Sequence, residues 1–380
     1  MKKSIFIIKK MLQNVSNYKN ISNNIKIRVQ YNKSISDCNS IKDSYKNINN
    51  MKNFLKAFDE FNENFELINY VNSGSCGVVY EGKLRKSKNG QSIGLKFLIG
   101  KKDKKNDKNK LKEIYFQQKL HHKNITSLYG YYEFKENSCI AMDYAKYGDL
   151  ENFQKTIIPN KNISETLLTF FALQILEGLL YCHQNKVIHM DIKQQNILIY
   201  DDLNIKITDF SVSQSYDHLQ SGDKFQLPLF GTVLYMSPEV LCLMKIDVDE
   251  LNKTDIFSLG VVLYNLAFKS FPYEWKLSDG KNFIFILKKL LKNELSIPND
   301  SNYSNLFKNF IKGLLDKDIK CRLSICQALN DPWIRAARLI LKEKEKIYDL
   351  DKFLINMLAN NIQPFNDYIK NYRFDHSTSD

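Results

Sequence analysis

The sequence predicts a bilobed α+β fold, with a small lobe built on a five-stranded antiparallel sheet plus one inserted helix and a larger, mainly helical lobe. Short apolar, β-branched runs separated by turns occupy residues 65–144, and apolar residues spaced three and four apart occupy the segments after Gly148. Alternation is typical of strands and the longer period of helices, so the change of pattern marks the boundary between the lobes. A chain of 380 residues is long enough to bury such a core.

The individual elements follow from these patterns. The five expected strands cover residues 65–71, 77–84, 92–98, 125–134 and 138–144. The inserted helix is expected over residues 110–120, after a lysine-rich loop at 101–110, and the main helices of the large lobe over 165–183 and 255–268. Two short strands, 196–199 and 205–207, precede a long loop that ends at Pro238, and long loops inside compact domains are usually functional.

The domain is expected to span residues 65–334, with the small lobe at 65–142, a hinge at 143–148 and the large lobe at 149–334. Residues 1–64 are expected to form a basic, Asn- and Lys-rich extension that is disordered, or helical only near residues 51–61. They contain neither Gly nor Pro, and 12 Lys and Arg outnumber 5 Asp and Glu. Residues 335–380 are expected to form a helical tail that packs on the large lobe.

The formal net charge of +13 is compatible with nucleic-acid or membrane-surface binding. Lys and Asn are frequent throughout the chain, however, so we do not expect nucleic-acid binding. If it occurred through the leader, deleting residues 1–64 would remove a steep salt dependence. The tail carries 8 basic and 7 acidic residues, unlike the basic helices that calmodulin binds, so calmodulin is not an expected partner.

Cysteine usage and hydropathy indicate the compartment. The seven cysteines are scattered and never spaced as CxxC, which is typical of reduced thiols in a cytoplasmic protein. No run of 18 apolar residues occurs, so a membrane span is not expected. The first 36 residues contain eight basic and no acidic residues, as a mitochondrial transit peptide does. A disordered leader is the preferred interpretation, and mitochondrial targeting is the alternative.

A glycine-containing turn and a buried cation are the first candidates for chemistry. Residues 72–79 read NSGSCGVV, and such loops let backbone N–H groups approach phosphate oxygens, although a glycine-rich hairpin without function looks the same. The candidate phosphate-binding residues of this loop are Asn72, Gly74, Gly77 and Val79. A lysine in an apolar strand usually faces solvent, but a buried Lys96 would need a carboxylate partner, which Glu113 on the inserted helix supplies.

The most specific segment reads HMDIKQQN at residues 189–196, and it is followed by DFS at 209–211 and SPE at 237–239. These segments resemble the catalytic loop HxDxKxxN and the DFG and APE motifs of the protein kinase superfamily. The resemblance extends over residues 65–334, and Lys193 makes it similar to the serine/threonine branch. Residues 207–213 loosely resemble the calcium/calmodulin-dependent kinase and kinase-kinase groups.

The resemblance implies transfer of the γ-phosphoryl group of ATP, with Mg²⁺ as cofactor, to serine or threonine of a protein substrate. It makes Asp191 the catalytic base and Lys193 the cation that neutralises the γ-phosphate. It makes Asn196 and Asp209 the Mg²⁺ ligands, since Mg²⁺ prefers oxygen donors.

The resemblance also assigns nucleotide contacts and two structural residues. Lys96 would hold the α and β phosphates, oriented by Glu113. The further nucleotide contacts are the gatekeeper Met142, the hinge residues Asp143 and Ala145, and Leu198. In the large lobe, Asp255 resembles the residue that clamps the catalytic loop, and Arg322 the arginine that pairs with Glu239.

One departure concerns the activation segment. Met190 stands where most kinases have an arginine that grips an activation-loop phosphate, so activity is expected not to require phosphorylation through that contact. Four loop residues are nevertheless candidates for modification: Ser213, Ser215, Tyr216 and Ser221.

Two further departures keep a second hypothesis open. Ser211 replaces the glycine of DFG, which is expected to disfavour a flipped state, and Gln117 takes a usually apolar position and needs partners if buried. With Met190 and Asn72 they support a pseudokinase scaffold. The retained polar residues of the catalytic set argue for activity.

Substrate choice is less specified. Kinases that prefer arginine before the target residue have carboxylates at three positions near the peptide groove. The matching residues here are Asp149, Gln195 and Asn265, and only the first is acidic, so an arginine-directed preference is not expected. A small-molecule kinase is an alternative, but Thr232 and the SPE segment match peptide-docking elements of protein kinases.

Overall fold

The computed structural model describes residues 47–55, 59–73, 77–85, 92–98, 104–134, 137–156, 163–200, 203–274, 283–298 and 303–336. Within these ranges the chain forms two compact units. The smaller unit contains the residues up to Lys146 together with Thr208–Ser211, and the larger contains Tyr147–Ile207 and the residues from Val212 onward. The predicted leader at 1–46, the tail beyond residue 336 and Gly74 lie outside the described residues.

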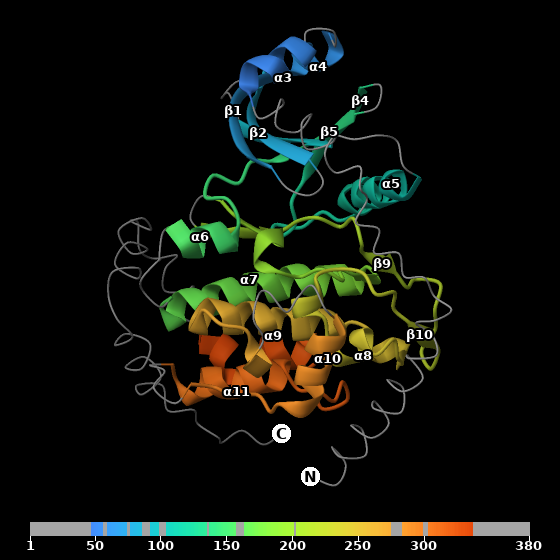
Figure 1. Cartoon of the computed structure of the whole chain (residues 1–380), viewed down its shortest axis with the longest axis vertical. Coiled ribbons are helices and arrows are strands. Elements are labelled where there is room, and N and C mark those ends of the chain that lie inside the picture. Colours follow the sequence, from blue (N-terminus) through green and yellow to red (C-terminus); the bar gives the residue numbers. More distant parts are fainter. Residues whose placement is uncertain are drawn as a thin grey trace, which may run out of the picture. The chain divides into compact units, whose positions relative to one another are not determined.

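The smaller unit is built on one antiparallel sheet with the strand order β1-β2-β3-β5-β4 (Figure 1). Its strands are β1 (Phe65–Ser73), β2 (Gly77–Leu84), β3 (Ser92–Leu98), β4 (Leu128–Phe134) and β5 (Asn137–Asp143). Helix α5 (Lys104–Lys119) is inserted between β3 and β4. Together with the mainly helical larger unit, this arrangement confirms the predicted α+β class.

Helix α5 begins at Lys104, six residues earlier than predicted, so residues 104–110 are helical rather than part of a loop. Lysine is a good helix former, and no Gly or Pro interrupts residues 101–110. High charge density alone was therefore a poor reason to predict a loop there.

Two helices precede the sheet, α3 (Ile48–Leu55) and α4 (Asp59–Asn64). Met51, Leu55 and Phe61 are buried in one hydrophobic cluster with residues of β1, β2, β3 and β5. The Phe61 ring lies 5.1 Å from that of Phe65 and 5.8 Å from that of Phe97. Residues 48–55 and 59–64 therefore form helices, where the sequence analysis allowed a helix only near residues 51–61, and their buried apolar residues pack on the sheet.

The larger unit is organised around two buried helices, α7 (Glu165–Gln184) and α9 (Lys253–Phe268), which pack against each other (Figure 1). Its other helices are α6 (Leu150–Thr156), α8 (Pro238–Leu241), α10 (Phe283–Lys292), α11 (Asn305–Leu314) and α12 (Ile325–Asn330). The Ser164 side chain caps α7 by accepting from Leu167 N, which satisfies one of the free N–H groups of the first turn.

Three two-stranded ladders complete the larger unit, and all are antiparallel. The ladders pair β6 (Val187–Ile188) with β9 (Gln214–Ser215), β7 (Ile197–Ile199) with β8 (Ile205–Ile207), and β10 (Lys224–Gln226) with β11 (Lys245–Asp247). The first two ladders hold the segment that contains residues 189–196, and the third holds the long loop that was predicted to end at Pro238.

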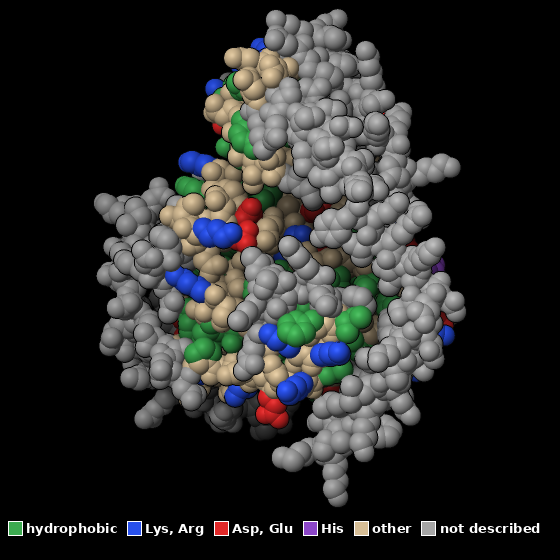
Figure 2. Space-filling view, in the orientation of Figure 1, with side chains coloured by type: hydrophobic (Ala, Val, Ile, Leu, Met, Phe, Trp, Pro, Cys, Tyr) green, Lys and Arg blue, Asp and Glu red, His purple; other side chains and the backbone are tan. Residues whose placement is uncertain are grey.

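Helix α7 is long and apolar enough to cross a membrane by length and composition alone, but 72% of its apolar window is buried inside the protein. That burial is what a core helix of a folded domain requires. On the face seen in Figure 2, described Lys and Arg side chains lie among hydrophobic and other side chains rather than in one continuous basic patch.

Candidate active site

The carboxylate of Asp191 is the centre of a hydrogen-bond network in the larger unit. Its Oδ1 accepts from Thr232 N at 2.8 Å, and its Oδ2 accepts from Lys193 Nζ at 2.6 Å and from Asn196 Nδ2 at 3.1 Å. Asn196 Nδ2 also donates to Asp191 O at 2.9 Å. The side chain is buried, and donors from three residues hold its two carboxylate oxygens, so its position and its orientation are fixed.

Lys193 and Thr232 form the edge of this network. Lys193 Nζ donates to Thr232 Oγ1 at 2.9 Å as well as to Asp191. Thr232 is brought close by Gly231, whose φ is +103°, and a Cβ at Gly231 would lie only 2.4 Å from Met190 O. Only glycine allows this approach without strain.

Asp255, near the start of α9, holds the backbone of the catalytic loop as predicted. Its Oδ2 accepts from His189 N and contacts His183 Nε2, both at 2.9 Å, and its Oδ1 accepts from Met190 N at 3.0 Å. Burial alone would raise the pKa of Asp255, but the hydrogen bond and charge of His183, with His189, hold the pKa below its ordinary value. The sequence analysis missed His183, whose only signal was a histidine at the end of a long apolar helix.

The two predicted metal ligands belong to different units. Asn196 is buried in the larger unit, and both of its bonds described above use Nδ2, which leaves Oδ1 as the atom for a cation. Asp209 belongs to the smaller unit and has a φ of +66°. An amide oxygen and a carboxylate are the hard donors that suit Mg²⁺, which usually takes one or two carboxylates together with substrate phosphates, so the donor chemistry fits this ion.

In the smaller unit, Lys96 on β3 forms the expected ion pair with Glu113 on α5, with Nζ and Oε1 2.7 Å apart. The Lys96 side chain is 15% exposed and that of Glu113 is 3% exposed. Burial raises the pKa of Glu113 above its ordinary value, against the lowering effect of Lys96, and the charge of Asp209 adds to the rise. The pair fixes the position of α5 beside β3.

The glycine-containing turn joins β1 and β2. Asn72, whose side chain accepts from Ser73 N at 2.7 Å, pairs with Val79 across the hairpin. Gly77 pairs with Leu98, and a Cβ there would lie 2.0 Å from Phe97 O. Close packing against β3 therefore requires a glycine at position 77, a reason independent of any phosphate.

The residues assigned to adenine are placed as follows. Met142 is buried on β5 and pairs with Gly94, while Asp143 points its carboxylate at β4 and accepts from Ser127 N at 2.9 Å and Tyr129 OH at 2.7 Å. Ala145 is half-buried in the segment after β5. In the larger unit, the half-buried Leu198 lies on β7. The Asp143 carboxylate is therefore already engaged by Ser127 and Tyr129 within the smaller unit.

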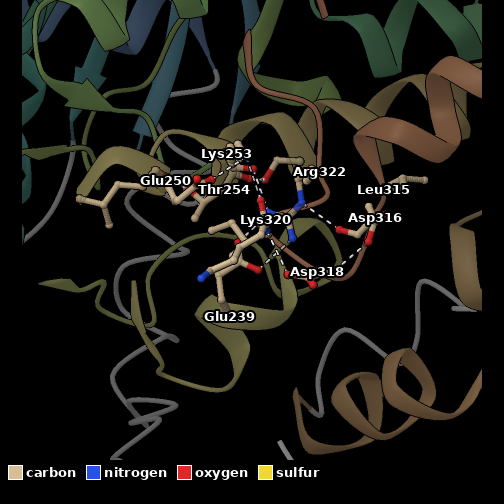
Figure 3. Close-up of polar contacts among 12 residues, drawn as sticks. Glu239, Glu250, Lys253, Thr254, Leu315, Asp316, Asp318, Lys320 and Arg322 are labelled. Carbon is tan, nitrogen blue, oxygen red and sulfur yellow. Dashed lines mark hydrogen bonds and ion pairs between the residues drawn. The ribbon is translucent and has the colours of Figure 1, made fainter. Parts of the chain in front are cut away.

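A buried ion pair ties the SPE segment to the rest of the larger unit (Figure 3). Arg322 Nη1 and Nη2 donate to Glu239 Oε1 and Oε2 at 2.7 and 2.9 Å. Arg322 also donates to Lys253 O and Asp316 O, at 2.9 Å each. The predicted pairing of Arg322 with Glu239 is therefore present.

Comparison with known proteins identifies the family. The family model described as the protein kinase domain matches residues 65–334. The chain belongs to the protein kinase family. Serine/threonine-protein kinase 36 of Mus musculus is 30% identical over 283 residues, which are 74% of this chain and 20% of that protein. The predicted family is thus confirmed.

Two other relatives are similar to this chain at nearly the same identity. Cell division control protein 7 of Schizosaccharomyces pombe is 31% identical over 284 residues, covering 74% of this chain and 25% of the relative. An Aurora kinase of Debaryomyces hansenii is 31% identical over 275 residues, covering 72% and 62%. The kinase domain described here therefore matches less than two thirds of each of these relatives.

Two of the four predicted modification candidates in the activation segment are buried in the structure. Ser213 is fully buried and donates to His189 O at 3.1 Å, and Tyr216 is buried and donates to His183 O at 3.1 Å. Ser215 is half-buried, and Ser221 is exposed. Strand pairing of β9 with β6 places the first two side chains inside the domain, which the loop assignment did not anticipate.

The remaining departures from the family motifs have clear local consequences. Ser211 is not among the described residues with positive φ, so its Cβ costs nothing in this conformation. Gln117 on α5 is fully buried, and neither of its amide atoms has a hydrogen-bond partner within the described part of the chain. The partners that a buried Gln117 was expected to need are therefore absent from the described residues.

Proposed function

We propose that the protein is a serine/threonine kinase that transfers the γ-phosphoryl group of Mg-ATP to a hydroxyl of a protein substrate. The network of Asp191, Lys193, Asn196 and Thr232 carries the proposal. Phosphoryl transfer depends mainly on positioning and charge stabilisation, and a fixed carboxylate beside a fixed ammonium meets both needs.

Asp191 is the proposed catalytic base, acting through Oδ1. A carboxylate oxygen has two lone-pair positions, and Oδ2 uses both, for Lys193 and Asn196. Oδ1 accepts only from Thr232 N among the bonds described above, so one position remains for the substrate hydroxyl. The Thr232 bond then aims Oδ1, and the proton of the hydroxyl passes to it as the oxygen attacks.

Lys193 is the proposed cation for the transferred phosphoryl group. An ammonium has three donors, and two of them are directed at Asp191 and Thr232. The third is free to follow the charge that develops on the phosphoryl oxygens. Bound Mg²⁺, for which Asn196 Oδ1 and the Asp209 carboxylate are the proposed ligands, supplies additional positive charge to the phosphates.

The nucleotide is proposed to bind through the smaller unit and Leu198. Lys96, aligned by its ion pair with Glu113, is proposed to bind the α and β phosphates. The backbone of Asn72, Gly74, Gly77 and Val79 is proposed to cover the phosphates. The backbone of Asp143 and Ala145 is proposed to bind adenine, beside Met142.

The test is radiolabelled phosphate transfer from Mg-ATP to a generic basic protein, with acid hydrolysis to identify the phosphoamino acid. Asp191→Asn is expected to lower the transfer rate by about 10²–10⁴-fold, as loss of a general base does. Asp217→Asn, the same chemical change on the exposed part of the loop, is the matched control and is expected to be active. Phosphotyrosine as the main product would refute the serine/threonine assignment.

A scaffold that binds nucleotide without transferring phosphate is the second candidate, and the unpartnered Gln117 favours it. Under this alternative both the native protein and Asp191→Asn bind ATP with the same affinity, measured by calorimetry, and neither transfers phosphate. Retention of the Lys96–Glu113 pair and of the Asp191 network supports the enzyme instead.

For substrate preference, we propose no strong requirement for arginine before the target residue. Asp149 Oδ1 accepts from Asn152 N at 2.8 Å, so one carboxylate oxygen already has a partner. Burial raises the pKa of Asp149, which disfavours the charged form that an arginine would pair with. Asn265 Nδ2 donates to Ser270 O. A positional peptide library in which basic residues before the target increase the rate by more than about tenfold would contradict this proposal.

We further propose a cytoplasmic location, which the free cysteines support: Cys139, Cys182, Cys242, Cys321 and Cys326. Mitochondrial targeting by residues 1–36 is the alternative. Cell fractionation of the full chain, compared with a chain that lacks residues 1–36, separates the two, since only a transit peptide would make the mitochondrial fraction depend on that segment.

A further inference from the structure

Helix α10 carries two large apolar side chains on the outside of the larger unit. Ile284 is 44% exposed and Phe285 is 43% exposed, and the two are adjacent in the first turn of the helix. Among the residues whose exposure the structure describes, they are the most exposed large side chains that lack a polar atom. Adjacent exposed apolar residues, unlike single scattered ones, are typical of a surface that binds something outside the chain.

The opposite side of α10 is anchored in the larger unit. Four of its residues are buried: Ile286, Leu287, Leu290 and Leu291. The helix packs against α8 and against the turn Val233–Tyr235. After its last turn, Asn293 Nδ2 donates to Tyr273 O at 3.2 Å, and Asn293 O accepts from Lys317 Nζ. The helix is therefore held in place, and its outer side is a preformed surface.

Lysines continue the outer side of α10 beyond the apolar pair. Lys288, Lys289 and Lys292 lie three, four and seven positions after Phe285, which places them on the same side of the helix. Lys288 and Lys292 are exposed, and Lys289 Nζ lies 4.9 Å from the centre of the Phe285 ring. The helix contains no acidic residue. In the orientation shared by Figures 1 and 2, hydrophobic and basic side chains lie next to one another in the region of α10.

An apolar pair followed by lysines fits an anionic membrane surface better than a protein partner. Protein interfaces are depleted of lysine. Helices that lie on membranes instead combine Phe or Leu, which enter the boundary of the acyl chains, with Lys or Arg at the lipid headgroups. The apolar stem of a lysine can follow the apolar region while its ammonium stays in water. The formal charge of the chain, +13, adds long-range attraction to anionic lipids.

We propose that α10 docks the kinase domain reversibly on membranes that contain anionic phospholipids. Ile284 and Phe285 enter the headgroup region, and the three lysines contact the lipid phosphates. The binding is peripheral, because only the outer side of α10 takes part. It uses no residue of the network around Asp191, so it does not rest on the proposed phosphoryl transfer.

The experiment measures sedimentation of the full chain with vesicles, without ATP. The protein is expected to bind vesicles of phosphatidylcholine with phosphatidylserine and to bind phosphatidylcholine alone much less. Lys288→Gln with Lys292→Gln is expected to lower the partition coefficient by about 25-fold, about fivefold for each lysine near an anionic surface. Lys52→Gln with Lys83→Gln, the same charge change at exposed residues of the smaller unit, is the matched control and is expected to have little effect.

A second pair of substitutions tests the apolar contact. Ile284→Ser with Phe285→Ser is expected to lower the partition coefficient by about tenfold, since each residue exposes less than half of its side chain. Both side chains are exposed, so urea unfolding is expected to be unchanged. In Phe285→Trp, fluorescence is expected to be quenched by lipids with brominated acyl chains more strongly than in the native protein. Equal quenching would show that residue 285 does not enter the bilayer.

Three results would overturn the proposal. The first is a native protein that does not bind the phosphatidylserine vesicles. The second is binding that survives all the α10 variants, because the basic residues 1–36 or another surface would then carry it. The third is a dimer without lipid that Ile284→Ser with Phe285→Ser converts to a monomer, because the surface would then join two copies of the chain.

Membrane docking and phosphoryl transfer are measured separately, so the two proposals fail in different ways. Vesicle binding that depends on α10, in a protein that never transfers phosphate, supports docking and refutes the kinase activity. Phosphate transfer in a protein that ignores anionic vesicles refutes docking alone.

Discussion

The guanidinium of Arg322 and the carboxylate of Glu239 lie side by side in a buried, two-point ion pair, with N–O distances of 2.7 and 2.9 Å. The Arg322 side chain is 0% exposed and that of Glu239 is 3% exposed. The Phe257 ring lies 5.0 Å from the guanidinium carbon. The end of the activation segment is thus tied directly to the segment before α12.

Removing one partner of this pair leaves the other charge buried without compensation. Arg322→Met is expected to lower the free energy of unfolding by about 3–5 kcal/mol. The double variant Arg322→Met with Glu239→Leu is expected to recover part of the loss, because neither charge then remains. Urea unfolding of the native protein, Arg322→Met, Glu239→Leu and the double variant measures this, and strictly additive losses would contradict a direct coupling.

Lys193 is expected to affect transfer more than nucleotide binding. Lys193→Met removes one donor from the position where charge develops, so kcat is expected to fall by about 10²–10³-fold. The Kd for ATP, measured by calorimetry, is expected to change little, since Lys96 is the proposed residue for the ground-state phosphate contact. A weaker Kd with an unchanged kcat would instead show that Lys193 is a binding residue only.

The buried Gln117 is expected to destabilise the smaller unit. Its amide has no partner within the described residues, and an unsatisfied buried group costs about 1–3 kcal/mol, so Gln117→Leu is expected to stabilise by a similar amount. Gln118→Leu, on the exposed side of α5, is the matched control and is expected to have little effect. Thermal unfolding reports the difference, and a destabilised Gln117→Leu would show that the amide has a partner such as water.

Strand boundaries in the small lobe were predictable because alternation is a local signal. β2 and β3 begin and end at the predicted residues, and β1 is only two residues longer. The ion pair of Lys96 with Glu113 and the clamp by Asp255 were also predictable, since the resemblance to kinases fixes their spacing. Their chemistry is tied to residue type as well as position.

Other features depended on tertiary contacts that no local pattern encodes. The burial of Ser213 and Tyr216 follows from the pairing of β9 with β6, two residues on each side. The packing of α3 on the sheet depends on Met51 and Leu55, which lie in an Asn- and Lys-rich stretch that also contains Ile48 and Phe54. The average polar composition of residues 1–64 concealed these apolar residues.

Phe61 on α4 provides a test of the neighbouring part of the same hydrophobic cluster. Phe61→Ala removes a ring that contacts Phe65, Phe97 and Tyr132, so it is expected to cost about 3–5 kcal/mol of unfolding free energy. Glu63→Ala, two residues away and exposed, is the control. Equal stability of both variants would show that Phe61 does not contribute to the core.

Glu165 at the start of α7 gives a pH prediction for the larger unit. Its carboxylate is buried and accepts from Ser304 N and Trp333 Nε1, each at 2.8 Å, and from Ser304 Oγ. Burial raises the pKa of Glu165 above its ordinary value of 4.5, and the hydrogen bonds only partly offset the rise.

A raised pKa means that the folded state binds the proton more tightly than the unfolded state does. The contribution of Glu165 to stability is therefore full below its ordinary pKa of 4.5 and is lost as the pH rises through the folded pKa. Relative to Glu165→Gln, the native protein is expected to lose stability as the pH increases above the ordinary pKa of 4.5. Urea unfolding followed by the fluorescence of the buried Trp333 measures this, and the subtraction cancels groups common to both proteins, such as Glu113. A native protein that gains stability relative to Glu165→Gln as the pH rises would mean that the three donors outweigh burial and lower the pKa of Glu165.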